Sequence, residues 1–196
     1  MTLTELINEV YNLTGRPDRT SETSSAIKSA TLKAHQSNYF YKDIFETGLA
    51  FNSADYVQSL DYRSLIPRYR AIKYLRKYDL ANNAPGKELD LIVPENLFDA
   101  YKVQKQDIFY VAGAYIQINS ATQEQYYLFG CYLNPDITDA GYTSWIALDH
   151  PYAIIFDAAA TVFKAIGKDE EASAYRNLVA EQLTMLASSN IVANGF

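Results

Sequence analysis

The side chains best suited to chemistry in this chain are two histidines and one cysteine, and they lie far apart in the sequence. His35 falls on the polar side of a helical pattern, and His150 precedes Pro151 at a helix start. Neither has a candidate partner that would make it a general base, so we expect both to be structural. Cys131 lies within an apolar strand pattern. It is expected to be a buried small hydrophobe in a chain that matures in a reducing compartment.

Three acids, Asp136, Asp139 and Asp149, lie near one another in a loop region. They lack the regular ligand positions of a calcium loop, so a solvated loop is the preferred interpretation. The sequence also has no glycine-rich phosphate loop, no nucleophile elbow and no zinc-ligand spacing. We therefore predict no catalytic residue, no metal and no cofactor, and we do not expect an enzyme.

A basic and aromatic segment, residues 62–78, is the other group that could recognise a ligand. Four tyrosines interleave with its charges, and the predicted contact residues are Arg68, Arg70, Lys73, Arg76 and Lys77. Such a segment can be the solvated side of an edge strand, or it can hold an acidic protein partner. Alternatively, it makes the chain a nucleic-acid-binding module that uses residues 62–78 for single strands. We favour the first two interpretations because no RNA-binding signature is present.

Composition limits the classes of partner. The 196 residues are 48% hydrophobic and carry a net charge of −6. An acidic chain is a poor general DNA binder, because attraction to phosphate dominates that affinity. The amphipathic, acidic start does not resemble a signal peptide, and no apolar run approaches the roughly 20 residues of a membrane span. The number of tyrosines, seventeen, is unusually high. Tyrosine suits either the edges of strands or interfaces that are partly exposed to solvent.

Periodicity predicts helices, then strands, then helices. Thr2 and Glu5 form a capping box for a helix that ends at Gly15, and a second helix is expected over about residues 21–39. Alternating patterns predict strands near residues 45–51 and 69–78, a hairpin around Ala112 and Gly113, and a strand at residues 126–133. A short helical turn is expected to begin at Pro94.

The last predicted helical pair turns at Gly167, and its first helix is apolar on two stripes. So wide an apolar face is usually buried on both sides. One side can pack on the second helix. The other side is covered either by the rest of the chain or by a neighbouring subunit. In the second case Tyr152, Phe156 and Phe163 are the predicted subunit-interface residues.

These elements predict an α+β fold that is mainly helical. The N-terminal and C-terminal helices form a bundle, with a small antiparallel β insertion between them. The expected segments of this one domain are N-terminal helices at 1–42, a β-rich insertion at 43–148, a C-terminal helix pair at 149–187 and a tail at 188–196.

In the order and spacing of these parts, the chain resembles the head-to-tail adaptor (connector) proteins of tailed bacteriophages. The resemblance spans nearly the whole chain, although no single piece is a sharp motif. The matching segments are LTELINEVYNLTG, SNYFYKDIFETGLAF, SLIPRYRAIKYLRKYD, LIVPENLFDAY, IFYVAGAYIQIN, YYLFGCYLNPDI and, most closely, the C-terminal helix pair from SWIALDHPYAIIF onward. One departure is INSATQEQ, which stands where family members often carry a proline-rich segment.

The resemblance implies a structural virion protein of the phage neck, made in the cytoplasm of the host bacterium. Adaptors form a homo-oligomeric ring, commonly of twelve copies, beneath the portal protein. The ring extends the channel for genomic DNA, without sequence-specific binding, and is a platform for a downstream tail or nozzle protein. The resemblance also implies that the C-terminal tail docks on the portal, with Ile191, Val192 and Phe196 as its expected anchors.

Overall fold

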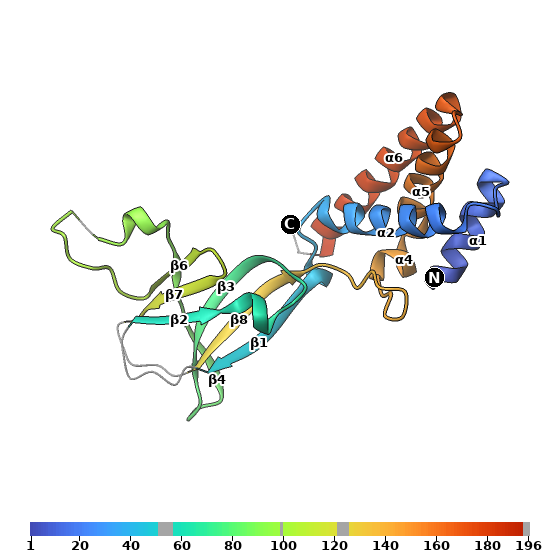
Figure 1. Ribbon diagram of the computed structural model, residues 1–196. Coiled ribbons are helices and arrows are strands. Elements are labelled where there is room, and N and C mark those ends of the chain that lie inside the picture. Colours follow the sequence, from blue (N-terminus) through green and yellow to red (C-terminus); the bar gives the residue numbers. More distant parts are fainter. Residues whose placement is uncertain (51–56, 99, 121–125, 194–196) are drawn as a thin grey trace. The chain divides into compact units, whose positions relative to one another are not determined.

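The computed structural model describes residues 1–50, 57–98, 100–120 and 126–193. The chain divides into two compact units (Figure 1). The first, here called the helical unit, combines Met1–Asp43 with Asn134–Phe196. The second, here called the β unit, is Ile44–Leu133. Each unit has its own cluster of buried hydrophobic side chains.

The helical unit begins with the predicted capping box. The side-chain oxygen of Thr2 accepts a hydrogen bond from the backbone N–H of Glu5, and the Glu5 carboxylate accepts one from the N–H of Thr2. Gly15 ends the first helix at a φ of 65°, a conformation that favours glycine. The elements of this unit are α1 (Leu3–Thr14), α2 (Thr20–Gln36), the 3-10 turn η1 (Tyr41–Asp43), α4 (Trp145–Asp149), α5 (Pro151–Ala165) and α6 (Asp169–Ala193).

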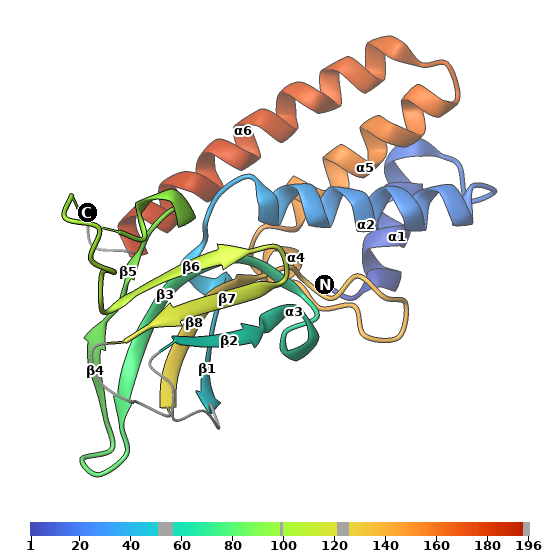
Figure 2. The ribbon, with the colours of Figure 1, turned by 60° about the vertical axis from the view of Figure 1, so that its left-hand side comes forward.

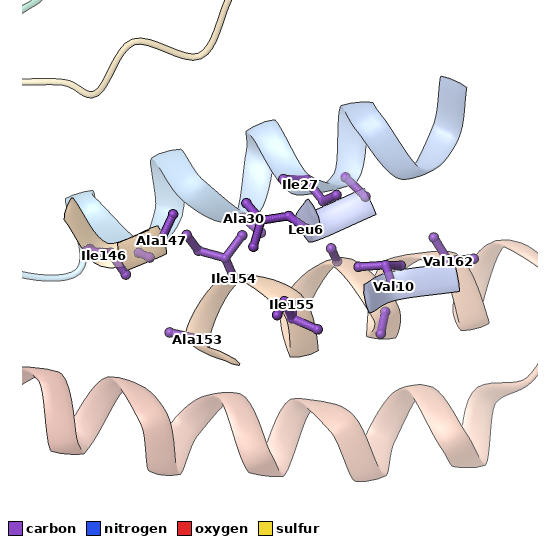
Figure 3. Close-up of a cluster of buried hydrophobic side chains, with 14 of the residues drawn as sticks. Leu6, Val10, Ile27, Ala30, Ile146, Ala147, Ala153, Ile154, Ile155 and Val162 are labelled. Atoms are coloured by element: carbon purple, nitrogen blue, oxygen red, sulfur yellow. The ribbon is translucent and has the colours of Figure 1, made fainter. Parts of the chain in front are cut away.

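Helix α5 is the centre of the helical unit, and it packs against α1, α2, α4 and α6. Ile154 and Ile155 on α5 are fully buried, and they lie among Leu6 and Val10 of α1 and Ile27 of α2 (Figure 3). Most of the apolar surface of this helix is therefore covered by the chain itself, although Tyr152 on one of the two stripes stays exposed. The sequence left open whether the rest of the chain or a neighbouring subunit covers the second side of this helix. In the structure, the N-terminal helices α1 and α2 cover most of that side.

The β unit consists of two four-stranded sheets, with strand orders β1-β8-β3-β4 and β2-β7-β6-β5 (Figure 2). All strand pairs are antiparallel except β5 with β6. Both sheets contribute to one core, which includes Leu75, Ile116 and Phe129. The elements are β1 (Ile44–Ala50), β2 (Val57–Asp61), α3 (Tyr62–Leu65), β3 (Tyr69–Asp79), β4 (Ala84–Glu88), β5 (Asp90–Leu91), η2 (Pro94–Asn96), β6 (Ile108–Ala112), β7 (Tyr115–Asn119) and β8 (Tyr126–Leu133).

The strands with clear alternating patterns are confirmed. Gly113 has a φ of 64° in the turn between β6 and β7, where the sequence places the hairpin. In β8, Tyr127, Phe129, Cys131 and Leu133 are predicted from the alternation to share one face; the first three are fully buried and Leu133 is half-buried. Strand β3 starts at Tyr69, as predicted.

The predicted fold class is wrong. Strand makes up 28% of the chain and helix 46%, so this is a mixed fold with substantial sheet and not a helical bundle with a small β insertion. The strands that the sequence pattern missed are the short ones. Strand β4 reads APGKE, β5 has only two residues and β2 has five. Strand β2 pairs with β7, β4 with β3 and β5 with β6, and this pairing rather than their own pattern makes these segments strands.

The boundaries of two segments also differ from the predicted ones. The β unit ends at Leu133, and the following residues, including α4, belong to the helical unit. Helix α6 continues to Ala193, so residues 188–193 extend this helix and do not form a separate tail. Asn190 near the end of α6 is hydrogen-bonded to the backbone of Tyr39 and Tyr41, which ties this segment to the rest of the helical unit.

Candidate subunit interface

An apolar strip on the outside of α5 and α6, formed by Tyr152, Phe156, Tyr175, Leu178 and Met185, is only partly covered by the chain. The ring centroids of Tyr152 and Phe156 are 5.3 Å apart, and those of Phe156 and Tyr175 are 5.7 Å apart. Leu178 and Met185 continue the strip on the same face of α6 as Tyr175. Tyr152 is 52% exposed, and Met185 is also more than half exposed. The strip therefore includes two of the three predicted interface residues.

Phe163, the third predicted interface residue, lies in the core of its own chain. It is 5% exposed, and its ring stacks on that of Tyr175 with centroids 5.4 Å apart. The Lys168 ammonium lies 5.6 Å from the centre of the same ring. Phe163 thus packs α5 on α6 within one subunit, and its burial leaves little surface for a neighbour.

The end of α6 is held by a buried asparagine that the sequence did not indicate. Asn190 Oδ1 accepts a hydrogen bond from the Tyr41 N–H at 3.2 Å, and its Nδ2 donates to the Tyr39 carbonyl at 3.2 Å. Ile191 and Val192 lie in the last turn of the helix, directly after this asparagine. The side chains of these two predicted portal anchors, and all of Phe196, lie outside the described residues.

The predicted basic contact residues divide into two groups. Arg76 pairs with Glu88 at 3.0 Å, and Lys77 pairs with Asp107 at 2.8 Å, so both charges are engaged within the β unit. Arg68 and Lys73 are exposed, and Arg70 is half-buried. Strand β4 pairs with β3 only from Arg76 to Asp79, so the part of β3 that holds Arg70 and Lys73 has β8 as its strand partner among the described residues.

Tyrosines of the basic segment serve the sheet itself. The Tyr74 ring lies flat over Gly130 of β8, where an added Cβ would come within 2.5 Å of the ring. Its hydroxyl donates a hydrogen bond to Glu46 of β1, and the Arg76 guanidinium lies 4.9 Å from its ring centre. Burial, then the bond to Glu46, raises the pKa of Tyr74 to about 12. This ring is committed to a cross-strand contact and is not free to stack on a base.

His35 has partners after all, which corrects the sequence-based expectation. It is 2% exposed rather than on a polar face. Its Nδ1 lies 2.8 Å from Asp43 Oδ1, and its Nε2 lies 2.9 Å from Ser144 Oγ. Trp145 Nε1 donates to the same Asp43 oxygen at 2.7 Å. These four side chains tie α2, η1 and α4 together.

The order Ser144–His35–Asp43 is also that of a nucleophilic triad. A carboxylate only accepts, so His35 Nδ1 carries the proton and, in the neutral ring, Nε2 accepts from the Ser144 hydroxyl. The Ser144 oxygen also accepts from the Ala147 N–H and caps α4. The histidine is buried and the serine hydroxyl caps α4, so both side chains have a packing role in the helical unit.

The remaining candidate residues have structural partners. His150 lies between α4 and α5, and its backbone N–H donates a hydrogen bond to the Ile146 carbonyl. Asp139 pairs with Lys28, and Asp149 pairs with Lys42. Over the described residues, no three potential metal ligands of the His, Cys, Asp and Glu types cluster. Within the same part of the chain, no helix combines the length and the apolarity that a bilayer crossing requires.

Comparison with known proteins gives no family. No protein-family model matches the chain, and no curated protein matches it significantly.

Proposed function

We propose that this chain is a structural subunit of a ring-forming head-to-tail adaptor of a tailed bacteriophage. In this proposal the ring lies beneath the portal protein, extends the DNA channel and carries the next tail or nozzle protein. The observation that carries the proposal is the apolar strip. The helical unit already has a complete core, yet Tyr152 and Met185 stay more than half exposed beside it. Large aromatic and methionine side chains are enriched in the buried parts of protein interfaces.

Two further features support the same proposal. A ring needs a heterologous contact, in which one face of a subunit meets a different face of the next. A strip on one side of a two-helix layer suits such a contact. The net charge of −6 suits the wall of a channel, because an acidic surface repels DNA that must slide past it.

The portal contact is proposed to involve the end of α6, with Ile191, Val192 and Phe196 as anchors. A deletion of residues 188–196 would also remove Asn190, which is bonded to the Tyr39 and Tyr41 backbone. Deletion of 191–196 is therefore the better test. It should preserve the melting temperature and weaken docking on the portal protein, and unaltered docking would refute this role.

The strip is tested by replacing Tyr152 and Met185 with serine and measuring mass by light scattering, alone and with the portal protein. The matched control is Leu80→Ser, which changes a residue of similar exposure in the turn between β3 and β4. The strip variant should keep its fold and lose ring assembly, whereas the control should assemble normally. Normal assembly by the strip variant would remove the observation on which the proposal depends.

A further inference from the structure

The side chains of Ser144, His35 and Asp43 form a hydrogen-bonded line inside the helical unit. Ser144 Oγ lies 2.9 Å from His35 Nε2, and His35 Nδ1 lies 2.8 Å from Asp43 Oδ1. These are the distances expected when a nucleophile is held by a general base that is itself oriented by a carboxylate. His35 is on α2, Asp43 ends η1 and Ser144 is the N-cap of α4, so the fold assembles this line from three separate elements.

The partners of each group place the protons that attack by Ser144 would require. Asp43 also accepts a hydrogen bond from Trp145 Nε1 at 2.7 Å, on the same oxygen that faces His35. Two donors on one carboxylate oxygen orient the imidazole with Nδ1 protonated, so Nε2 carries the lone pair that accepts from the Ser144 hydroxyl. His35 Nε2 is therefore positioned to take the proton of the Ser144 oxygen as that oxygen attacks.

The cap on α4 leaves the Ser144 oxygen able to react. This oxygen accepts one hydrogen bond, from the Ala147 N–H at 3.2 Å, and its own proton points to His35. A hydroxyl oxygen has two acceptor lone pairs, so the second one remains for a bond to an electrophile. Helix capping and nucleophilic attack thus use different parts of the same oxygen.

Burial differs along the line in the way that a nucleophile requires. His35 is 2% exposed and Asp43 is 7% exposed, whereas Ser144 is half-buried, so the serine is the member that solvent reaches best. The Trp145 ring lies edge-on to the His35 ring with centroids 5.7 Å apart, and the Phe40 ring packs against Trp145 at 5.2 Å. These contacts fix the base and the acid before any ligand arrives, and such positioning lowers the barrier to reaction.

We propose that Ser144 is a nucleophile toward small activated esters, with His35 as its general base and Asp43 as the positioning residue. In the first step the Ser144 oxygen bonds to the ester carbonyl carbon, and its proton passes to His35 Nε2. The bond from that carbon to the alcohol oxygen breaks, and the alcohol leaves with the proton. In the second step water attacks the acyl-serine by the same route, which releases the carboxylic acid and restores the hydroxyl. This activity is independent of the proposed ring.

A fluorophosphonate probe tests the nucleophile directly. The serine oxygen bonds to phosphorus, fluoride leaves, the proton passes to His35, and the adduct stays on the serine, where peptide mass spectrometry locates it. The adduct should form on Ser144 and approach one per chain. Ser64 is the internal control, because it is an exposed serine whose hydroxyl donates to the Asp61 carbonyl. It should remain unlabelled over the same time.

Two variants separate reactivity from the structural role. Ser144→Asn removes the hydroxyl but keeps a side chain that caps helices as well as serine does, so it should keep the melting temperature and lose the adduct. Asp43→Asn keeps an acceptor for Trp145, while its amide can donate to His35 and select the wrong tautomer. It should slow labelling at least about 100-fold in a chain that circular dichroism shows to be folded. Ser64→Ala should be labelled like the parent.

Release of nitrophenolate from p-nitrophenyl acetate follows the complete reaction, and Ser144→Asn should abolish the release above the rate in buffer. A folded parent chain that gives no adduct on Ser144 would overturn the inference. Equal labelling of Ser144 and Ser64, or labelling that Asp43→Asn leaves unchanged, would overturn it too, because exposure alone would then explain the reaction. A chain that is labelled but releases nitrophenolate no faster than Ser144→Asn would refute the hydrolysis.

Discussion

Replacing Phe163 with alanine is expected to destabilise the fold, and replacing Tyr152 is not. Phe163 is 5% exposed and stacks on Tyr175, so its loss opens a cavity between α5 and α6. Buried Phe→Ala substitutions cost about 3–5 kcal/mol. For a chain of this length, 1 kcal/mol lowers the melting temperature by about 2–4 °C, so the fall should be roughly 6–20 °C. Tyr152→Ala removes a ring that is 52% exposed and should change stability by less than about 1 kcal/mol.

Both variants are compared by circular dichroism at a helical wavelength during heating, and by light scattering at equal concentration. Phe163→Ala should melt early, with any loss of assembly following from its lower stability. Tyr152→Ala should melt like the parent chain and assemble poorly. If Phe163→Ala melted like the parent and yet failed to assemble, Phe163 would belong to an interface, and our assignment of it to the core would be refuted.

Four other predictions concern hydrogen bonds and the Tyr74 ring. Asp43→Ala leaves the buried donors of His35 and Trp145 without an acceptor and should lower the free energy of unfolding by about 2–4 kcal/mol. The fluorescence of Trp145, the only tryptophan, should change even at low temperature. An unchanged spectrum would argue against the hydrogen bond from Trp145 to Asp43. Gly130→Ala should displace the Tyr74 ring and lower the pKa of Tyr74 from about 12 towards 10, detectable as tyrosinate absorbance at lower pH. Since the folded pKa is raised, the stabilisation by Tyr74 is complete below pH 10 and is lost between about pH 10 and 12; stability that stays level across that window would contradict this. Asn190→Ala should lower stability by about 1–3 kcal/mol in urea unfolding, and an unchanged midpoint would mean that its two bonds contribute nothing.

Local signals predicted the parts of the fold that depend on local chemistry. The capping box at Thr2 and the turn at Gly113 depend on neighbours a few residues away, so the sequence is enough to find them. The alternation in β8 is equally local, and three of the four residues on its predicted face are fully buried. Strand β4 was missed because APGKE has the composition of a turn and becomes a strand only beside β3. Because this strand was missed, the predicted β insertion was smaller than the observed β unit.

The candidate sites show the same division between local and distant information. Tyr152 was singled out because an aromatic stripe on a helix is visible in the sequence, but Phe163 on the same stripe is buried by Tyr175. Whether such a ring faces its own chain or a neighbour depends on how α6 packs, which spacing does not specify. The partners of His35 are equally distant in the sequence, since Ser144 lies 109 residues away.

The most direct test of the central claim is the mass of the purified chain in solution, measured by light scattering alone and after mixing with the portal protein encoded near it. If the chain is an adaptor, mixing it with the portal protein should give a stoichiometric complex of ring size, visible as stacked rings in negative-stain images. A chain that remains monomeric in both samples, at concentrations where the portal ring is intact, would contradict the adaptor proposal.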